Sequence, residues 1–319
     1  MTESKKICSI VVPVFGNGDC LNELVDRVDS SFSSAGLEHP EIIFVDDLGP
    51  GNAWEKICHL RSKRRNVIGV QLMRNTGQHN AVMCGFRHAH GDIIITMDDD
   101  LQHEPESIPQ LIECLRRTNS DLVYGVYDSK KHAGTRNFGS WVVTRFYRIV
   151  SRMPITITSF RAVRRELVAA ILHYDLNFTF IDGLLAWNTQ RIETIPVAHH
   201  PRAQGKSGYT LRALLALALN IFTNFSLIPL QVVSLLGITT AVTGLGLGSW
   251  YLIAAMRSAI EVPGYASTIV AILVLGGIQM LSLGVIGEYV GRLHLNVNRK
   301  PQYTVRQTIS SSGIAQSTN

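Results

Sequence analysis

The chain has 319 residues, of which 46% are hydrophobic and 17% charged, and its formal net charge is +5. This length accommodates one large domain or two ordinary ones, and the net charge is too small to indicate a nucleic-acid-binding protein. The five cysteines all lie within the first 114 residues and form no C-x-x-C pair, which favours reduced thiols in a cytosolic domain. Residues 1–210 are mixed in character, whereas residues 211–290 carry almost no charge.

Alternating strands and helices are predicted for the first half of the chain. Short apolar runs rich in β-branched residues are typical of buried strands, and apolar residues three or four positions apart are typical of helices. This alternation indicates an α/β fold with a parallel sheet covered by helices. Residues 1–6 lead straight into the first strand, so no signal peptide is expected. Strands are predicted at 7–14, 41–45, 67–72, 92–97 and 121–124, and helices at 21–32, 53–64, 80–88 and 106–116.

Acidic residues stand where two of these strands end. Asp46 and Asp47 follow the second strand, and Asp98, Asp99 and Asp100 follow the fourth. A D-x-D run alone is more often a solvated turn, but ligands of such sheets bind beyond the carboxyl ends of the strands, where these acids converge. Buried carboxylates are costly unless a cation accompanies them. Asp98 and Asp100 can therefore share one divalent cation, which would neutralise a diphosphate leaving group.

Two stretches in the second half are long enough to span a bilayer. Residues 230–256 and 265–286 contain no charged residue, and each exceeds the roughly 20 apolar residues that a spanning helix needs. Basic residues are frequent before residue 165 and in 292–306, so the positive-inside rule places both termini in the cytosol. Buried core helices are the alternative. The glycines of both stretches permit close helix contact, within one chain or in a homo-oligomer such as a dimer or tetramer.

The remaining segments complete the predicted organisation. Residues 140–153 suit an amphipathic helix resting on lipid headgroups, or equally a core helix, and 211–228 suits an interfacial segment. The polar, serine-rich end, residues 310–319, is predicted to be disordered. The predicted parts are a catalytic domain (1–210), the interfacial segment (211–228), two transmembrane helices (229–291) and a cytosolic tail (292–319).

Four motifs in this order resemble glycosyltransferase family 2. They are S-I-V-V-P-V-F (9–15), F-V-D-D (44–47), R-N-T-G-Q-H-N-A (74–81) and M-D-D-D-L-Q (97–102). The third motif, the run D-D-D-L-Q-H-E-P-E and the ending G-E-Y-V-G-R (287–292) are similar to polyprenyl-phosphate glycosyltransferases. Those enzymes include dolichol-phosphate mannose synthase, bactoprenol glucosyltransferases and undecaprenyl-phosphate aminoarabinose transferases. The resemblance covers residues 7–305.

The resemblance implies a GT-A (Rossmann-like) fold and an inverting, metal-dependent transfer. The sugar would pass from a nucleotide-sugar, most simply a UDP-sugar, to undecaprenyl phosphate at the cytosolic leaflet of a bacterial inner membrane. Asp98, Asp100 and Gln102 would hold Mg²⁺ or Mn²⁺, and Asp99 would point away from the metal without a role. The implied donor-binding residues also include Pro13, Val14, Phe15, Asp46, Asp47, Arg74, Asn75, Gly77, Gln78 and His79.

The acceptor would be a phosphate, which is already ionised and needs a cationic cradle rather than a strong base. Arg161, Arg202 and Lys206 are candidates for that cradle, although solvated surface charges are the alternative for the last two. Residues 199–209 resemble the family loop H-x-x-R-x-x-G-x-S-x-Y, which Arg202, Ser207 and Tyr209 match.

One position departs from many family members. Ser159 stands where many members carry the acid of a G-D-F-R motif. The aminoarabinose transferases also lack an acid there, which mildly favours an unusual sugar. Asp182 could supply a carboxylate instead, or it could be structural.

Three other functions are alternatives to this one. A processive polysaccharide synthase should carry a Q-x-x-R-W motif and more spans, which the sequence lacks. A glycosyltransferase with a soluble acceptor and a non-catalytic membrane scaffold also remain, although a scaffold predicts loss of Asp98 and Asp100. The sequence leaves open the sugar, UDP or GDP, and Mg²⁺ or Mn²⁺.

Overall fold

The computed structural model of the chain consists of two compact units. The first unit combines Met1–Gly208 with Lys300–Asn319, and the second is Tyr209–Arg299. The predicted segment 140–153, and the predicted segment 211–228 except for its last residue, lie outside the described residues. The structure describes residues 8–127, 158–174, 179–198, 228–256, 264–297, 301–310 and 313–316.

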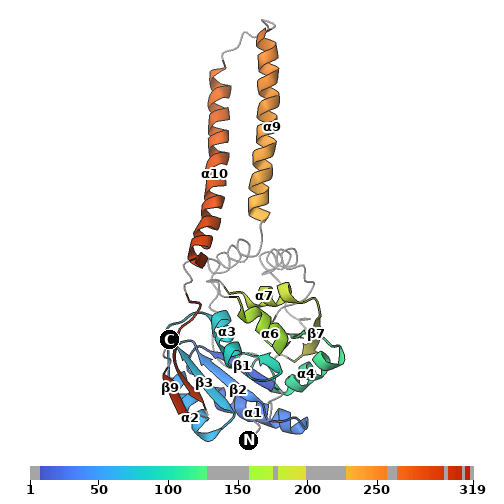
Figure 1. Ribbon diagram of the computed structural model, residues 1–319, viewed down its shortest axis with the longest axis vertical. Helices are drawn as coiled ribbons and strands as arrows, with labels where there is room; N and C mark the ends of the chain where they lie inside the picture. The colour runs from blue at the N-terminus through green and yellow to red at the C-terminus, as the bar shows by residue number, and fades with distance from the viewer. Residues whose placement is uncertain are drawn as a thin grey trace, which may run out of the picture. The chain divides into compact units, whose positions relative to one another are not determined.

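The first unit is built on a mixed sheet, five of whose strands (β1, β2, β3, β7 and β9) are labelled in Figure 1. The strand order is β7-β5-β6-β4-β1-β2-β3-β8-β9. The α/β prediction is confirmed, but the sheet is mixed rather than parallel. The strands β3, β2, β1 and β4 are parallel, whereas β6 is antiparallel to both β4 and β5. The strands are β1 (Cys8–Val14), β2 (Glu41–Asp46), β3 (Val67–Leu72), β4 (Ile93–Thr96), β5 (Leu122–Tyr127), β6 (Arg161–Arg164), β7 (Ile192–Val197), β8 (Val305–Ser310) and β9 (Gly313–Gln316).

Helices cover both faces of this sheet, which is why its central strands are continuous apolar runs. The core beneath α1, α2 and α4 contains Ile10, Val12 and Phe44. On the other face α3 approaches β1 so closely that a Cβ added at Gly85 would lie 2.3 Å from Cγ1 of Val11. The helices are α1 (Leu21–Ser34), α2 (Ala53–Lys63), α3 (Gln78–His88), α4 (Ile108–Arg117), α6 (Arg165–Leu172) and α7 (Ile181–Asn188), with the 3-10 turn η1 (Pro105–Ser107) before α4.

The end of the chain corrects the prediction of disorder. Residues 305–310 form β8, which pairs antiparallel with β3, and 313–316 form β9, which pairs with β8. Backbone hydrogen bonds supply this pairing, so a polar sequence can form the edge of the sheet. Gly69 leaves room for the pairing, because a Cβ there would lie 2.8 Å from Cγ2 of Ile309. Residues 305–310 and 313–316 are therefore part of the sheet of the first unit.

The second unit contains two long apolar helices, α9 (Ile228–Met256) and α10 (Tyr265–Val297). Both are long and apolar enough to cross a membrane, and their most apolar windows contain no buried residue. Large side chains such as Leu245, Trp250 and Met280 are more than 70% exposed. The described part of α9 and α10 thus has no soluble core around it, which indicates membrane association. Helix α10 ends at Val297, beyond the predicted end at residue 286.

The glycines of α9 and α10 whose surroundings the structure describes do not lie at a contact between the two helices. A Cβ added at any of them would meet no atom within 4 Å, so they leave open surface on the described helices. The glycines in question are Gly237, Gly244, Gly246, Gly276, Gly277, Gly284 and Gly287.

Candidate active site

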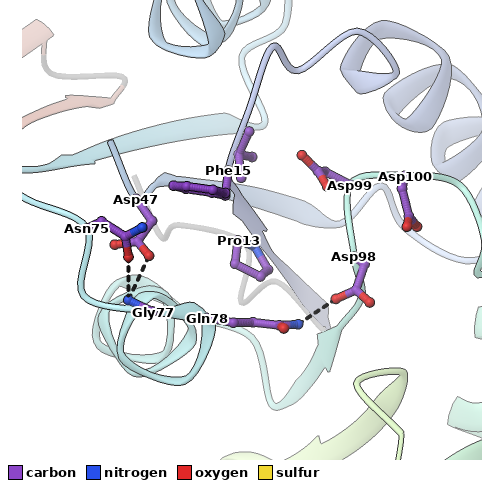
Figure 2. Close-up of a pocket in the computed structure, with 10 residues that line it drawn as sticks. Pro13, Phe15, Asp47, Asn75, Gly77, Gln78, Asp98, Asp99 and Asp100 are labelled. Atoms are coloured by element: carbon purple, nitrogen blue, oxygen red, sulfur yellow. Dashed lines mark hydrogen bonds between the residues drawn. The ribbon is translucent and has the colours of Figure 1, made fainter. Parts of the chain in front are cut away.

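A cavity of about 300 Å³ opens at the carboxyl ends of β1, β2 and β4. Figure 2 shows the acidic run 98–100 on one side of it and Asp47 with Asn75 on the other, with Pro13 and Phe15 between them. Neither lysine nor arginine is among its described lining residues. These are Pro13, Val14, Phe15, Asp47, Asn75, Gly77, Gln78, Asp98, Asp99 and Asp100.

The carboxylate of Asp98 is held by two donors. Its Oδ1 accepts a hydrogen bond from Nε2 of Gln78 at 2.7 Å, and its Oδ2 accepts one from Oγ of Ser159 at 2.7 Å. Asp100 Oδ1 accepts a hydrogen bond from the backbone N–H of Gln102 at 3.1 Å. Gln102 thus contacts Asp100 through its backbone, and its side chain is not part of the described cavity lining.

The turn that carries these acids is fixed from behind by His103. Its Nδ1 accepts a hydrogen bond from the backbone N–H of Asp98 at 3.1 Å, and its buried ring stacks on Phe160 and Tyr127 at centroid distances of 5.1 and 5.9 Å. Burial, followed by the charges of the acidic run, raises the pKa of Tyr127. The next residue after the run, Leu101, has φ +57°. A bulky residue in this left-handed region is unusual and is commonest at functional sites.

Asp47 organises the opposite wall. Its Oδ1 accepts hydrogen bonds from the backbone N–H and the hydroxyl of Thr76 at 2.7 and 3.0 Å, and its Oδ2 accepts one from the N–H of Gly77 at 2.8 Å. Burial raises the pKa of this carboxyl, although these hydrogen bonds oppose the rise. Leu48, which follows, has φ +50°. Both acidic strand ends therefore lead into a strained leucine.

Asp46 differs from the prediction that it lines the donor pocket. It is 4% exposed, and its Oδ2 accepts a hydrogen bond from Nε2 of Gln71 at 2.9 Å. Successive residues of a strand point to opposite faces, so only Asp47 of this pair borders the cavity. Arg74, also predicted, is exposed and is not among the described lining residues.

Arg161 and Asp182 were predicted as an acceptor-cradle residue and a catalytic carboxylate, but the structure pairs them with each other. The Arg161 guanidinium donates through Nη1 to Asp182 Oδ1, and through Nε to Oγ1 of Thr96 at 3.0 Å. The hydroxyl of Tyr124 also donates to Asp182 Oδ1, at 2.9 Å. Arg161 is 2% exposed and Asp182 is 6% exposed. An ion pair this buried cannot cradle a phosphate without being broken.

Ser159 links this buried pair to the cavity. Thr96 Oγ1, which accepts from Arg161, donates to the carbonyl of Ser159 at 2.5 Å, and the Ser159 hydroxyl in turn donates to Asp98. Ser159 therefore acts here as a hydrogen-bond donor to the acidic run, not as a base.

His79, also predicted, is not among the described residues that line the cavity. Its ring makes an edge contact with Phe180 at a centroid distance of 5.4 Å. Burial lowers its pKa, the charge of Asp182 raises it and that of Arg161 lowers it again. Four other predicted residues lie outside the described residues: Arg202, Lys206, Ser207 and Tyr209.

Sequence reasoning missed three contributors. Asp99 was expected to point away, yet it lines the cavity with its two neighbours. Thr76 ties its loop to Asp47, and His103 fixes the turn of the acidic run. The signal for Thr76 and His103 was present, since both belong to quoted motifs, but only the folded chain assigns them a partner.

A divalent cation fits the acidic side of this cavity. Asp98, Asp99 and Asp100 place three carboxylates around one open volume. Among the residues that the structure describes, no group of three or more His, Cys, Asp or Glu side chains is placed to hold a metal by itself. Mg²⁺ is usually bound by one or two carboxylates together with substrate phosphates and water. A cation here would accordingly depend on a bound diphosphate for the rest of its ligands.

Comparisons with known proteins agree with this architecture. The profile of "Glycosyl transferase family 2" matches residues 9–172, and that of "GtrB C-terminal hairpin" matches residues 228–293. A Synechocystis protein described as an uncharacterized glycosyltransferase, sll0501, is 33% identical over 302 residues, which cover 93% of this chain and 94% of that protein.

Two solved structures are similar at low sequence identity. Glucosyl-3-phosphoglycerate synthase from Mycobacterium tuberculosis, in complex with Mn²⁺, UDP and phosphoglyceric acid, has a TM-score of 0.51 and 16% identity, over 69% of this chain and 78% of that one. S. aureus TarS 1-349 in complex with UDP-GlcNAc has a TM-score of 0.44 and 17% identity, over 66% and 65% of the two chains. The first supports the GT-A-like fold. The profiles and the Synechocystis relative go further: this chain belongs to glycosyltransferase family 2, with a GT-A-like nucleotide-sugar transferase domain followed by a GtrB-type hairpin.

Proposed function

We propose that this glycosyltransferase moves a sugar from a UDP-sugar to undecaprenyl phosphate at the cytosolic face of a bacterial inner membrane, with Mg²⁺ or Mn²⁺ bound. The observation that carries the proposal is an acidic cavity at the carboxyl ends of the strands, in a chain that also has two membrane-length apolar helices. Ligands of α/β sheets bind at this edge.

The cavity suits a nucleoside diphosphate only in the company of a cation. Its lining contains four carboxylates, those of Asp47, Asp98, Asp99 and Asp100, and the diphosphate is itself anionic. Like charges that share one cavity repel each other unless a cation lies between them. When bound, the metal would neutralise the charge that develops on the departing diphosphate. The Mn²⁺ and UDP held by the M. tuberculosis enzyme support the same choice of ligands here.

The opposite wall suits the nucleoside. Phe15 is 56% exposed and borders the cavity, so its ring is available for contact with a base. Asp47 holds the backbone of Thr76 and Gly77, and thereby the loop that carries Asn75 and Gln78 to the cavity. We propose that this wall binds UDP and that the acidic side binds its diphosphate.

The transfer needs a correctly positioned acceptor phosphate rather than a general base. An oxygen of the acceptor phosphate would attack the anomeric carbon as the bond from that carbon to the UDP oxygen breaks, and UDP would leave with the bonding electrons. The phosphate monoester is ionised near neutral pH, so no proton need be removed first. Because Arg161 is paired with Asp182, Arg202 and Lys206 remain the proposed cradle, and Ser207 and Tyr209 belong to the same sequence motif.

The apolar helices favour a lipid acceptor. A catalytic domain tethered by α9 and α10 would work at the membrane surface, where a polyprenyl phosphate presents its headgroup. We propose that the hairpin crosses the bilayer twice, with both termini in the cytosol. The glycine pattern of the two helices also suggested a homo-oligomer, a dimer or a tetramer. Light scattering of the detergent-solubilised protein would measure its size.

The test is transfer from a panel of radiolabelled UDP- and GDP-sugars to undecaprenyl phosphate in detergent, with Mg²⁺, Mn²⁺ or EDTA. We expect a product that extracts into organic solvent and that disappears in EDTA. A water-soluble product from added soluble acceptors would instead identify a transferase with a different acceptor. If neither nucleotide binds in the presence of metal, the enzyme hypothesis fails and the scaffold function is favoured.

A further inference from the structure

The chain returns from the second apolar helix to the catalytic domain beside the candidate donor site. We call residues 301–310, which follow α10, the return segment. Its strand β8 pairs with β3 through Val70–Thr308 and Gln71–Gln307, and Gln302 Nε2 donates to the carbonyl of Tyr174 at 3.1 Å. The return segment therefore belongs to the same unit as the cavity.

The return segment directly holds the loop that forms one wall of the cavity. The backbone N–H of Met73 donates to the carbonyl of Thr304 at 2.8 Å, at the point where β3 ends and the loop 73–77 begins. At its other end the same loop is bound to Asp47 through Gly77. The loop is thus anchored at one end by the tail of the chain and at the other by the acidic end of β2.

A second contact runs through side chains. Gln307 Nε2 donates to Oε1 of Gln71 at 2.9 Å, and Gln71 Nε2 donates to Oδ2 of Asp46 at 2.9 Å. A carboxylate only accepts hydrogen bonds, so Gln71 must offer its NH₂ group to Asp46 and its oxygen to Gln307. Gln307, Gln71 and Asp46 thus form a relay of two hydrogen bonds. Both bonds are donated in the direction from β8 to β2, and the relay ends on the residue next to Asp47. Gln71 and Asp46 are both at most 9% exposed, so losing a partner leaves a buried polar group unpaired.

From these contacts we infer that the return segment is a positioning element of the donor site, with Gln307 as its principal side chain. It keeps the end of β2 and the loop 73–77 in the geometry that lines the cavity. Gln307 is not among the described residues that line the cavity, so its effect on the donor is indirect. This inference rests on the proposed function for its effect on UDP, but its effect on the loop is independent of any ligand.

The experiment compares Gln307→Leu with Thr308→Val in the full-length protein in detergent. Leucine has a similar volume but cannot donate to Gln71, whereas Thr308→Val removes a hydroxyl from the other face of the same strand. Titration calorimetry with UDP and Mn²⁺ should give a Kd raised about 3- to 10-fold for Gln307→Leu and unchanged for Thr308→Val. The KM for the lipid acceptor should stay close to that of the unmodified protein. The melting temperature of Gln307→Leu should fall by a few degrees, because the buried Gln71 oxygen loses its donor, whereas that of Thr308→Val should not change.

A reversed relay separates positioning from a general packing effect. Gln307→Glu places an acceptor against the Gln71 oxygen and should weaken UDP binding. Adding Asp46→Asn lets the Gln71 amide turn over, so that it donates to the new carboxylate on β8 and accepts from the new amide on β2. We expect the double variant to bind UDP more tightly than Gln307→Glu alone. Equal or weaker binding of the double variant would overturn the relay.

Hydrogen exchange without ligand keeps this inference separate from the proposed function. The N–H groups of Met73, Thr76 and Gly77 should exchange faster in Gln307→Leu than in Thr308→Val, even if UDP proves not to be the ligand. Unchanged exchange and unchanged UDP affinity in Gln307→Leu would refute a positioning role. Failure of the unmodified protein to bind UDP, with faster exchange in Gln307→Leu, would refute only the donor assignment.

Discussion

The two edges of the central sheet both carry buried carboxylates, but they use them differently. At the amino edge Glu41, which is 3% exposed, accepts hydrogen bonds from the Ser9 hydroxyl at 2.7 Å and from the backbone N–H of His90 at 3.0 Å. Its other oxygen lies 3.0 Å from Nδ1 of His90. The Ser9 oxygen also accepts from the N–H of Gly91 at 2.8 Å. This edge is closed by its own hydrogen bonds.

At the carboxyl edge the acids border an open volume. Asp47, Asp98, Asp99 and Asp100 line the cavity, and the described lining offers them no basic side chain. One layer behind, Asp182 resembles Glu41, since Arg161 and Tyr124 satisfy it inside the domain. The difference teaches that a carboxylate at the edge of the sheet marks a candidate binding site only where it also borders an open cavity, because internal hydrogen bonds hold both Glu41 and Asp47. The predictions that follow test this distinction.

The largest effect is expected at Asp182, whose buried carboxylate is paired with Arg161 inside the domain. Asp182→Leu leaves the buried Arg161 charge unpaired, which should cost about 3–5 kcal/mol of folding free energy and lower the melting temperature by about 10 °C. Differential scanning fluorimetry in detergent measures this. In the double variant Asp182→Leu with Arg161→Met no charge is stranded, so most of the loss should be recovered. A double variant as unstable as Asp182→Leu would contradict the pairing.

Asp100→Asn tests the open edge. The asparagine oxygen can still accept the hydrogen bond from the N–H of Gln102, so the turn should survive while the charge is lost. We expect sugar transfer to fall about 100-fold, with little change in melting temperature. The matched control is Glu23→Gln, an exposed acid on α1. Activity within about threefold of the unmodified protein would remove Asp100 from the proposed metal site.

Glu41→Leu tests the closed edge. The Ser9 hydroxyl would lose its acceptor, and the His90 N–H would keep only the Ser9 oxygen, at 3.2 Å. The unfolding free energy should therefore fall by about 1–3 kcal/mol, whereas the affinity for UDP should not change. Glu41→Gln keeps one oxygen acceptor and should retain most of the stability. Chemical denaturation with parallel UDP titration separates the two readouts. A specific loss of UDP binding in Glu41→Leu would show that the amino edge is not purely structural.

The smallest effect concerns His79, because burial lowers its pKa below the ordinary 6.5. The unfolded chain binds the proton more readily than the folded one, so the contribution of His79 to stability is complete above pH 6.5 and declines as pH falls toward its folded pKa. The melting temperature of the ligand-free protein should therefore drop between about pH 7.5 and 5.5. In His79→Leu the drop should be shallower. Parallel curves for the two proteins would rule out His79 as a contributor.

Local pattern was sufficient for much of the molecule. The five predicted strands appear within a few residues of their predicted bounds, because strands buried on both faces need unbroken apolar runs such as that of β1. The helix expected at 106–116 appears as η1 and α4, and the two charge-free stretches appear as α9 and α10. The positions of the acids at strand ends could also be read from the sequence, since they depend only on where each strand stops.

The partners of those acids could not be predicted from local pattern. Asp46 and Asp47 are neighbours in the sequence, and only the register of β2 against β1 and β3 decides that the second one borders the cavity. Arg161 and Asp182 each looked catalytic until the antiparallel strand β6 brought Arg161 beside Thr96 and within reach of Asp182.

The sequence by itself determined an α/β domain, its acidic strand ends and two membrane-length helices, because each follows from composition and period within a short window. The transferase function was implied by the resemblance of four motifs to glycosyltransferase family 2. Only the tertiary structure decided that the polar tail joins β3, that Arg161 is neutralised by Asp182, and that Asp99 faces the cavity. These features depend on contacts between segments that the chain separates widely. Such contacts are selected by the packing of the whole sheet and leave no local periodicity to read.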